Sequence, residues 1–212
     1  DRAQAGLDYT GPVNASKSLL FRVVGLTRDS GTQVHHVDDN TLVFSPSLSW
    51  RPNSDTEITF LANVQENASG TTAQFLPWTG TILPGPSGAL DTATFISEPG
   101  WDRYDTEQTA LTAIVDQRIN QTWRFHGAAR YTDSSADYRS MWPTFPPTIQ
   151  ADGRTITRTA YVSDASAQAL VGDLQLAGVF GSGRVRHSFI GGFDFQDATT
   201  DNNTWYGFGG TL

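Results

Sequence analysis

The chain has 212 residues, a net charge of −8 and no cysteine. The absence of cysteine excludes disulfide bonds and thiolate metal sites, and the scattered Lys and Arg residues exclude the clustered positive charge that a nucleic-acid partner requires. No apolar stretch approaches the ~18 residues of a membrane-spanning helix. The length fits one domain or a piece of a larger protein.

Apolar and polar residues alternate along most of the chain, which predicts β-strands. The clearest example runs from Leu42 to Trp50 and resumes from Ile58 to Val64, with apolar side chains at every second position. Between the two runs, residues 52–55 (Pro-Asn-Ser-Asp) have the composition of a tight turn. We predict about eight strands by this criterion, at residues 4–10, 18–29, 38–51, 56–67, 105–118, 122–134, 153–181 and 184–198.

The connections between these strands alternate in length. Tight turns are predicted at residues 52–55 and 181–183, whereas residues 67–104 and 134–152 form long stretches without helical periodicity. Short turns at one end and long loops at the other are typical of outer-membrane barrels. We therefore predict an all-β fold, an antiparallel up-and-down meander that is part of a transmembrane β-barrel with long extracellular loops.

Two features leave alternatives open. The predicted seventh strand is too long for one membrane crossing, so we expect it either to continue as an extracellular arm or to break near residues 163–166. Trp50, Trp123 and Phe180 lie near the turns, where they could form an interfacial girdle of a barrel or part of the core of a soluble sheet.

Several segments, in order along nearly the whole chain, carry a family resemblance. They are Phe21-Arg22-Val23-Val24-Gly25, Pro46-Ser47-Leu48-Ser49-Trp50-Arg51-Pro52, Gln74-Phe75-Leu76-Pro77, Glu98-Pro99-Gly100-Trp101, Tyr104-Asp105-Thr106-Glu107-Gln108-Thr109, Ala129-Arg130-Tyr131-Thr132-Asp133 and residues 187–194. Together they resemble TonB-dependent ferric-siderophore receptors, especially the ferrichrome and hydroxamate branch.

The resemblance implies a function and a location. Receptors of this family form barrels of about 22 strands with an internal plug, sit in the outer membrane of Gram-negative bacteria and import ferric siderophores with energy from TonB. Residues 1–212 would be a partial barrel domain from the first half of the barrel, without the plug domain or the C-terminal strands. The expected partners are a ferric siderophore, outer-membrane lipid and, through the full-length receptor, TonB and the plug. No enzymatic activity and no cofactor are expected, because the ferric siderophore is a transported ligand.

The resemblance also implies a ligand site built from aromatic rings, which offer large contact areas at low entropy cost. Phe75, Trp142 and Tyr206 match positions where hydroxamate receptors keep such rings, but Ala73 stands where the family has another ring. Tyr138 and Trp78 are further candidates, followed by Trp205. The alternative for each of these rings is that it packs one loop against another.

Other sites are less well supported by the sequence. Arg103 and Arg139 could bind an anionic chelate or be solvated loop charges. His35-His36 with Asp38-Asp39 could bind a metal or be solvated in an exposed polar loop. Acid–base chemistry at Asp55 with Glu57, or at Asp102 with Asp105, lacks a matching pocket.

Two rival functions remain open: a soluble all-β binding module, such as a carbohydrate-binding sandwich, and an enzyme on a β scaffold. In a barrel, the Phe44/Leu48 and Phe60/Val64 rows would point outward, whereas in a sandwich they would pack against a second sheet.

Overall fold

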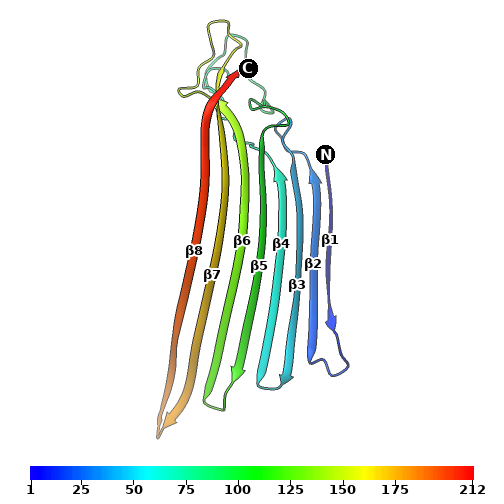
Figure 1. Ribbon diagram of the computed structural model, residues 1–212, viewed down its shortest axis with the longest axis vertical. Coiled ribbons are helices and arrows are strands. Elements are labelled where there is room, and N and C mark those ends of the chain that lie inside the picture. The colour runs from blue at the N-terminus through cyan, green and yellow to red at the C-terminus, as the bar shows by residue number, and fades with distance from the viewer.

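Eight antiparallel strands, hydrogen-bonded in sequence order, form one curved sheet in the computed structural model, which describes residues 1–212 (Figure 1). This arrangement confirms the predicted all-β meander. The strands are β1 (Arg2–Pro12), β2 (Leu19–Ser30), β3 (Asp39–Asn53), β4 (Thr56–Ser69), β5 (Arg103–Arg118), β6 (Trp123–Pro143), β7 (Thr157–Ser182) and β8 (Val185–Thr211). The structure contains no helix that is long and apolar enough to span a membrane.

The two ends of the sheet differ, as the connection lengths predict. At the turn end, at the bottom of Figure 1, the strands are joined by residues 13–18, 54–55, 119–122 and 183–184. At the loop end, at the top, the connections are residues 31–38, 70–102 and 144–156. Gly183 adopts a positive φ of 62°, which the first central position of a two-residue hairpin turn of type II′ requires.

The two faces of the sheet also differ. Residues directly opposite each other on paired strands share a face, and one such row joins Phe21, Leu48, Phe60 and Ala113. Along each strand this face, called the apolar face, is lined over its middle and turn-end part by apolar side chains that no other element covers. Phe44 is 48% exposed and Phe60 is 53% exposed. A sandwich would bury these rings under a second sheet, so the sandwich alternative is wrong for this chain.

The opposite, polar face carries cross-strand ion pairs and hydrogen bonds. Arg22 on β2 binds Asp8 on β1 at 2.6 Å, and the hydroxyls of Ser49 and Thr59 lie 2.8 Å apart between β3 and β4. On β6, the Nδ1 atom of His126 lies 2.7 Å from a carboxylate oxygen of Asp116 on β5. Polar pairs of this kind suit a surface that faces water or a hydrated partner.

Most of the few buried residues lie at the loop end, in the loops and in the upper ends of the strands. Val34, Val37, Ile96 and Ile156 form the apolar part of this small core, and Gln74, Ser97 and Arg158 are buried polar residues beside it. The long β4–β5 loop (residues 70–102) thus packs against the other loops and the upper strands.

Three strands differ from their predicted bounds: β6 and β8 are longer, and β7 is slightly shorter and unbroken. β6 continues to Pro143, so the expected loop at residues 134–152 shrinks to residues 144–156. β7 runs without interruption from Thr157 to Ser182, so a break near residues 163–166 is wrong. β8 continues to Thr211 instead of ending near residue 198. These upper segments are paired residue by residue with their neighbours, which supplies the hydrogen bonds that a lone arm would lack.

Candidate ligand-binding site

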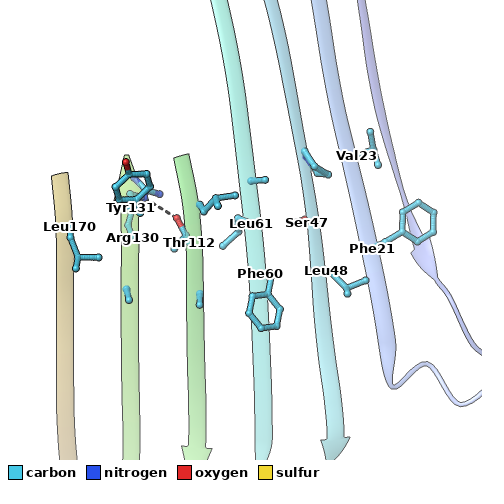
Figure 2. A pocket seen from close by; sticks show the side chains of 15 residues that line it. Phe21, Val23, Ser47, Leu48, Phe60, Leu61, Thr112, Arg130, Tyr131 and Leu170 are labelled. Atoms are coloured by element: carbon cyan, nitrogen blue, oxygen red, sulfur yellow. Dashed lines mark hydrogen bonds between the residues drawn. The ribbon is translucent and has the colours of Figure 1, made fainter. Parts of the chain in front are cut away.

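Two regions of the sheet could receive a ligand. One is a shallow hollow of about 620 Å³ in the apolar face, lined mainly by apolar side chains such as Phe21, Leu48 and Leu170 (Figure 2). Its polar members Arg130 and Thr112 hydrogen-bond to each other at 2.9 Å and belong to the polar face. A specific site needs convergent polar groups beside apolar surface, so the hollow is the weaker candidate.

The second region is a group of aromatic rings at the loop end. Five of its rings come from strands: Tyr104 on β5, Tyr138 and Trp142 on β6, Tyr161 on β7 and Tyr206 on β8. Tyr104 lies directly opposite Tyr138, and Tyr161 lies directly opposite Tyr206. The pairing register places all five on the polar face. Phe75, from the β4–β5 loop, is the sixth ring, and we call the six the aromatic cluster.

Ring-to-ring contacts connect the whole cluster. Tyr161 is at its centre, with ring centroids 5.6 Å from Tyr138, 5.3 Å from Trp142 and 4.8 Å from Tyr206. Tyr104 meets Tyr138 edge to face at 5.3 Å. Such tilted and edge-to-face arrangements are the favoured geometries of aromatic pairs. The cluster therefore offers apolar ring surface together with several phenol hydroxyls that can donate hydrogen bonds.

Phe75 completes the cluster from the loop above the sheet. Its ring centroid lies 6.5 Å from that of Trp142 in an edge-to-face contact, and the side chain is 60% exposed. The backbone of Phe75 has a positive φ of 49°, which is uncommon for a bulky residue and must be held by its surroundings. A ring that is both exposed and held in a strained conformation is a feature of ligand contacts more than of packing.

The structure brings together four of the five residues expected at the site. Phe75, Trp142, Tyr206 and Tyr138 belong to the aromatic cluster, but the last three lie on strands and not in loops. Trp78 lies apart in the β4–β5 loop, 71% exposed, and makes no ring contact with the cluster.

Sequence reasoning missed Tyr104 and Tyr161. The signal that could have found them is strand register. Each lies directly across from a candidate residue, but such pairing is readable only once the strand ends are known.

The two candidate arginines lie on the other face of the sheet. Arg103 and Arg139 are directly opposite each other on β5 and β6, one position out of phase with Tyr104 and Tyr138. Both bind Asp137, through Arg103 Nη1 at 3.3 Å and Arg139 Nε at 3.1 Å. They are therefore strand residues in an ion-pair network, and the expectation that they lie in loops is wrong.

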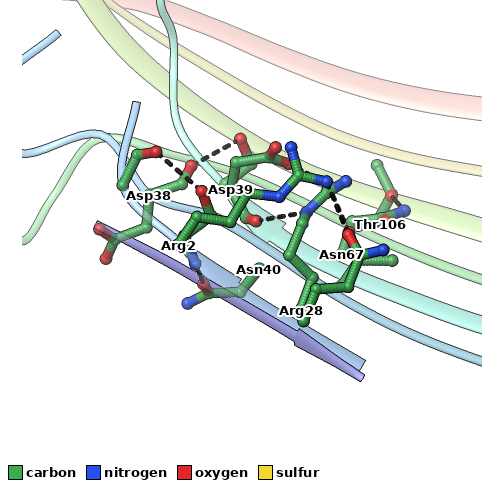
Figure 3. Close-up of polar contacts among 12 residues, drawn as sticks. Arg2, Arg28, Asp38, Asp39, Asn40, Asn67 and Thr106 are labelled. Carbon is green, nitrogen blue, oxygen red and sulfur yellow. Dashed lines mark hydrogen bonds and ion pairs between the residues drawn. The ribbon is translucent and has the colours of Figure 1, made fainter. Parts of the chain in front are cut away.

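The remaining candidate sites are used structurally. No group of three or more His, Cys, Asp or Glu side chains is arranged to hold a metal ion. The His36 ring is tilted against that of Phe95 with centroids 5.6 Å apart, and Asp39 is bound by Arg28 (Figure 3). Asp55 pairs with Arg118, and Glu57 pairs with Arg51.

The last acidic pair caps backbone donors. Asp102 accepts the backbone N–H of Thr71 at 2.9 Å, and Asp105 accepts that of Ser69 at 3.3 Å. Both carboxylates therefore fix the start of the β4–β5 loop.

A single uncovered sheet with an apolar face, a polar face and a ring-lined loop end defines a segment of barrel wall of the outer-membrane type.

No family model matches the chain. Among curated proteins, it is 24% identical over 207 residues to the ferrioxamine B receptor of Salmonella typhimurium strain SL1344, covering 96% of this chain and 28% of the receptor. It is also 24% identical over 219 residues to the ferrichrome outer membrane transporter/phage receptor of Escherichia coli K12, covering 97% and 29% of the two chains.

Solved structures give the same result for the fold. The ferripyoverdine receptor of the Pseudomonas aeruginosa outer membrane, bound to ferripyoverdine, superposes with a TM-score of 0.86 at 16% identity, covering 100% of this chain and 28% of the receptor. The predicted resemblance to siderophore receptors of the outer membrane is therefore confirmed. The relatives are transport receptors and not enzymes. The chain spans less than a third of their length.

Proposed function

We propose that this chain forms part of the wall of an outer-membrane receptor that binds a ferric siderophore and imports it with energy supplied through TonB. The carrying observation is the aromatic cluster, which gathers five rings of the polar face and the loop residue Phe75 at the loop end. The names of the relatives support a siderophore as ligand, with ferrioxamine B and ferrichrome as the first compounds to test.

The proposed receptor needs more than these eight strands. β1 and β8 each pair on one side only, and an unpaired strand edge in lipid costs several kcal/mol for each exposed polar group. We therefore propose that both edges pair with further strands of a complete barrel, whose interior holds a plug domain. In that barrel the apolar face contacts lipid, and the loop end opens to the outside.

In the proposed binding step, the rings contact the chelate and the phenol hydroxyls hydrogen-bond to it. Tyr161, Tyr138, Trp142 and Tyr206 form the floor, and Phe75 contacts the ligand from the loop. Trp78 is a further proposed contact, reached only by a ligand that extends along the loop above the cluster. The receptor uses no cofactor and performs no chemical step on the siderophore.

Ring removal tests this proposal in the full-length protein. Ferrioxamine B and ferrichrome are titrated against the unchanged receptor and against Phe75→Ala, Trp142→Ala and Tyr206→Ala. Each change should weaken binding of the preferred compound by about tenfold or more, because each removes a large contact surface worth roughly 1–3 kcal/mol.

Trp205→Ala is the matched control. Trp205 is the neighbour of Tyr206 on β8 and has an even larger ring, but it lies on the other face of the sheet. Its removal should leave affinity unchanged. Equal affinities for all four variants and the unchanged receptor would refute the proposed site.

A further inference from the structure

Three buried polar side chains lie between the β4–β5 loop and the sheet. Arg158 on β7 is 5% exposed, and Ser97 and Gln74 of the loop are 1% and 7% exposed. Such burial is uncommon in this chain, in which only 16 of 212 residues are buried. Buried polar groups are costly unless they are hydrogen-bonded, so their partners indicate what the burial achieves.

Arg158 binds the loop at three consecutive residues. Its Nη1 donates to the backbone carbonyls of Ile96 at 3.1 Å and Ser97 at 2.8 Å. Its Nη2 donates to a carboxylate oxygen of Glu98 at 3.1 Å. Removing the guanidinium would leave two carbonyls and a carboxylate without their donor, which costs more than the loss of a single exposed ion pair.

The loop segment fixed by Arg158 is also tied to the neighbours of two rings. The backbone N–H of Ile96 donates to Gln74 Oε1 at 2.7 Å, and Gln74 directly precedes Phe75. The backbone N–H of Met141 donates to Ser97 Oγ at 2.8 Å, and Met141 directly precedes Trp142. One short loop segment is therefore hydrogen-bonded beside each partner of the Phe75–Trp142 contact.

The hydrogen bonds of Gln74 also account for the strained backbone of Phe75. The positive φ of Phe75 needs support from its surroundings, and Gln74 supplies it from both ends of its amide. Its Oε1 is bound to Ile96, and its Nε2 donates to the carbonyl of Thr71. Releasing Ile96 would free Gln74 and, with it, the conformation that directs Phe75 toward Trp142.

We propose that Arg158 is a positioning residue for the ligand site. Through residues 96–98 and Gln74 it holds Phe75 against Trp142, so that the cluster is preorganised before the siderophore arrives. This inference rests on the proposed function. It predicts that Arg158, which belongs to the buried loop core and not to the cluster, controls affinity by way of Phe75.

The test is a double-mutant cycle in the full-length receptor, with ferrioxamine B or ferrichrome as the probe, whichever the unchanged protein binds more tightly. Arg158→Met keeps much of the side-chain length but removes the donors, and should weaken binding about tenfold. In the Phe75→Ala background the same change should have little further effect, because the ring that Arg158 positions is already absent. A purely structural role of Arg158 would give equal losses in both backgrounds.

Arg28→Met is the matched control. Arg28 on β2 also donates to a backbone carbonyl, that of Asp39 at 3.0 Å, and binds the Asp39 carboxylate and the Thr41 hydroxyl (Figure 3). It does not touch the β4–β5 loop segment at residues 96–98, so affinity should stay within about twofold. If Arg158→Met fails to fold, Arg158→Lys replaces it in the cycle, since it keeps a charge for Glu98 but loses the planar fork that donates to all three partners.

The outcomes separate the two proposals. Full affinity in Phe75→Ala, Trp142→Ala and Tyr206→Ala alike would overturn the proposed site itself, and full affinity in Phe75→Ala alone would overturn the positioning role. Weakened binding in Phe75→Ala, combined with either full affinity or fully additive loss in the Arg158 variant, would overturn the positioning role alone. Non-additive loss with an unchanged Arg28→Met supports both.

Discussion

Asp152 shows how one exposed carboxylate can organise a long loop. In the β6–β7 loop it accepts hydrogen bonds from the hydroxyl of Thr155 and from the backbone N–H groups of Arg154 and Thr155, at 3.0 and 2.9 Å for the two backbone donors. These donors favour the charged form, the Thr155 hydroxyl most strongly, and lower the pKa of Asp152 from 3.8 to about 2.

A depressed pKa fixes the direction of the pH dependence. The turn at residues 152–155 should be fully stabilised above pH 4 and should lose that stabilisation as the pH falls through about 2. NMR titration of the Asp152 carboxyl measures this pKa directly. In Thr155→Val, which keeps the shape but removes the hydroxyl donor, the midpoint should rise toward 3.8. An unchanged midpoint would mean that the hydroxyl is not the main cause.

At the same scale, the candidate site shows what one sequence can and cannot predict. The family resemblance predicts Phe75, Trp142 and Tyr206 at one site, and the structure brings them together. Tyr161, which joins them, lies in a plain strand without a motif. Its position depends on register with β6 and β8, which is a long-range property of the fold.

At the scale of elements, aromatic rings of the apolar face cover glycines near the turns. Trp123 on β6 lies directly opposite Gly178 on β7, and a Cβ added to Gly178 would come within 2.4 Å of its indole ring. Gly178→Ala should therefore displace the indole and cost about 1–3 kcal/mol of stability. Urea unfolding of the receptor in lipid vesicles, followed by the shift of its folded band on unheated gels, measures this loss.

Gly172 provides the control for this substitution. It lies on the same strand and the same face as Gly178, but a Cβ there would meet only the carbonyl oxygen of Ala128 at 3.8 Å. Gly172→Ala should unfold within about 0.5 kcal/mol of the unchanged protein. Equal destabilisation by both substitutions would show that the loss of glycine matters and the contact with Trp123 does not.

The same elements explain which parts of the fold were predictable. Strand existence and turn positions follow from residues such as Leu42 to Val64, where one face is apolar and the other polar. The upper part of β6, around residues 134–140, is polar on nearly every position, so no alternation marks it as a strand. This part of β6 is recognisable as a strand only from its pairing with β5 and β7. Likewise, the end of β8 is recognisable only from its pairing with β7.

At the scale of the whole molecule, the upper edge of the apolar face slopes across the sheet. On β3 this edge lies at Leu42. The row of directly opposite residues that starts at Leu42 crosses the strands from β3 to β8 and ends at Asp201. On β8, however, the edge lies at Phe195, six residues nearer the turn end, because Asp197 is the next residue on that face. With ~3.3 Å per residue and ~4.8 Å between strands, the slope over five strand spacings is about 40°.

A slope of that size is the strand tilt expected of a closed transmembrane barrel, roughly 35–45°. If the apolar face meets lipid as proposed, the bilayer boundary should follow the slope and not the pairing rows.

Because the chain has no cysteine, single cysteines with spin labels can be placed on either side of the boundary at Leu42 and Asn40 on β3, and at Phe195 and Asp197 on β8. Labels at Leu42 and Phe195 should contact oxygen dissolved in lipid, and labels at Asn40 and Asp197 should contact a water-soluble relaxation agent. A boundary on β8 near Asp201 would mean that the strands stand upright in the membrane, which an eight-strand segment of a wide tilted barrel cannot do.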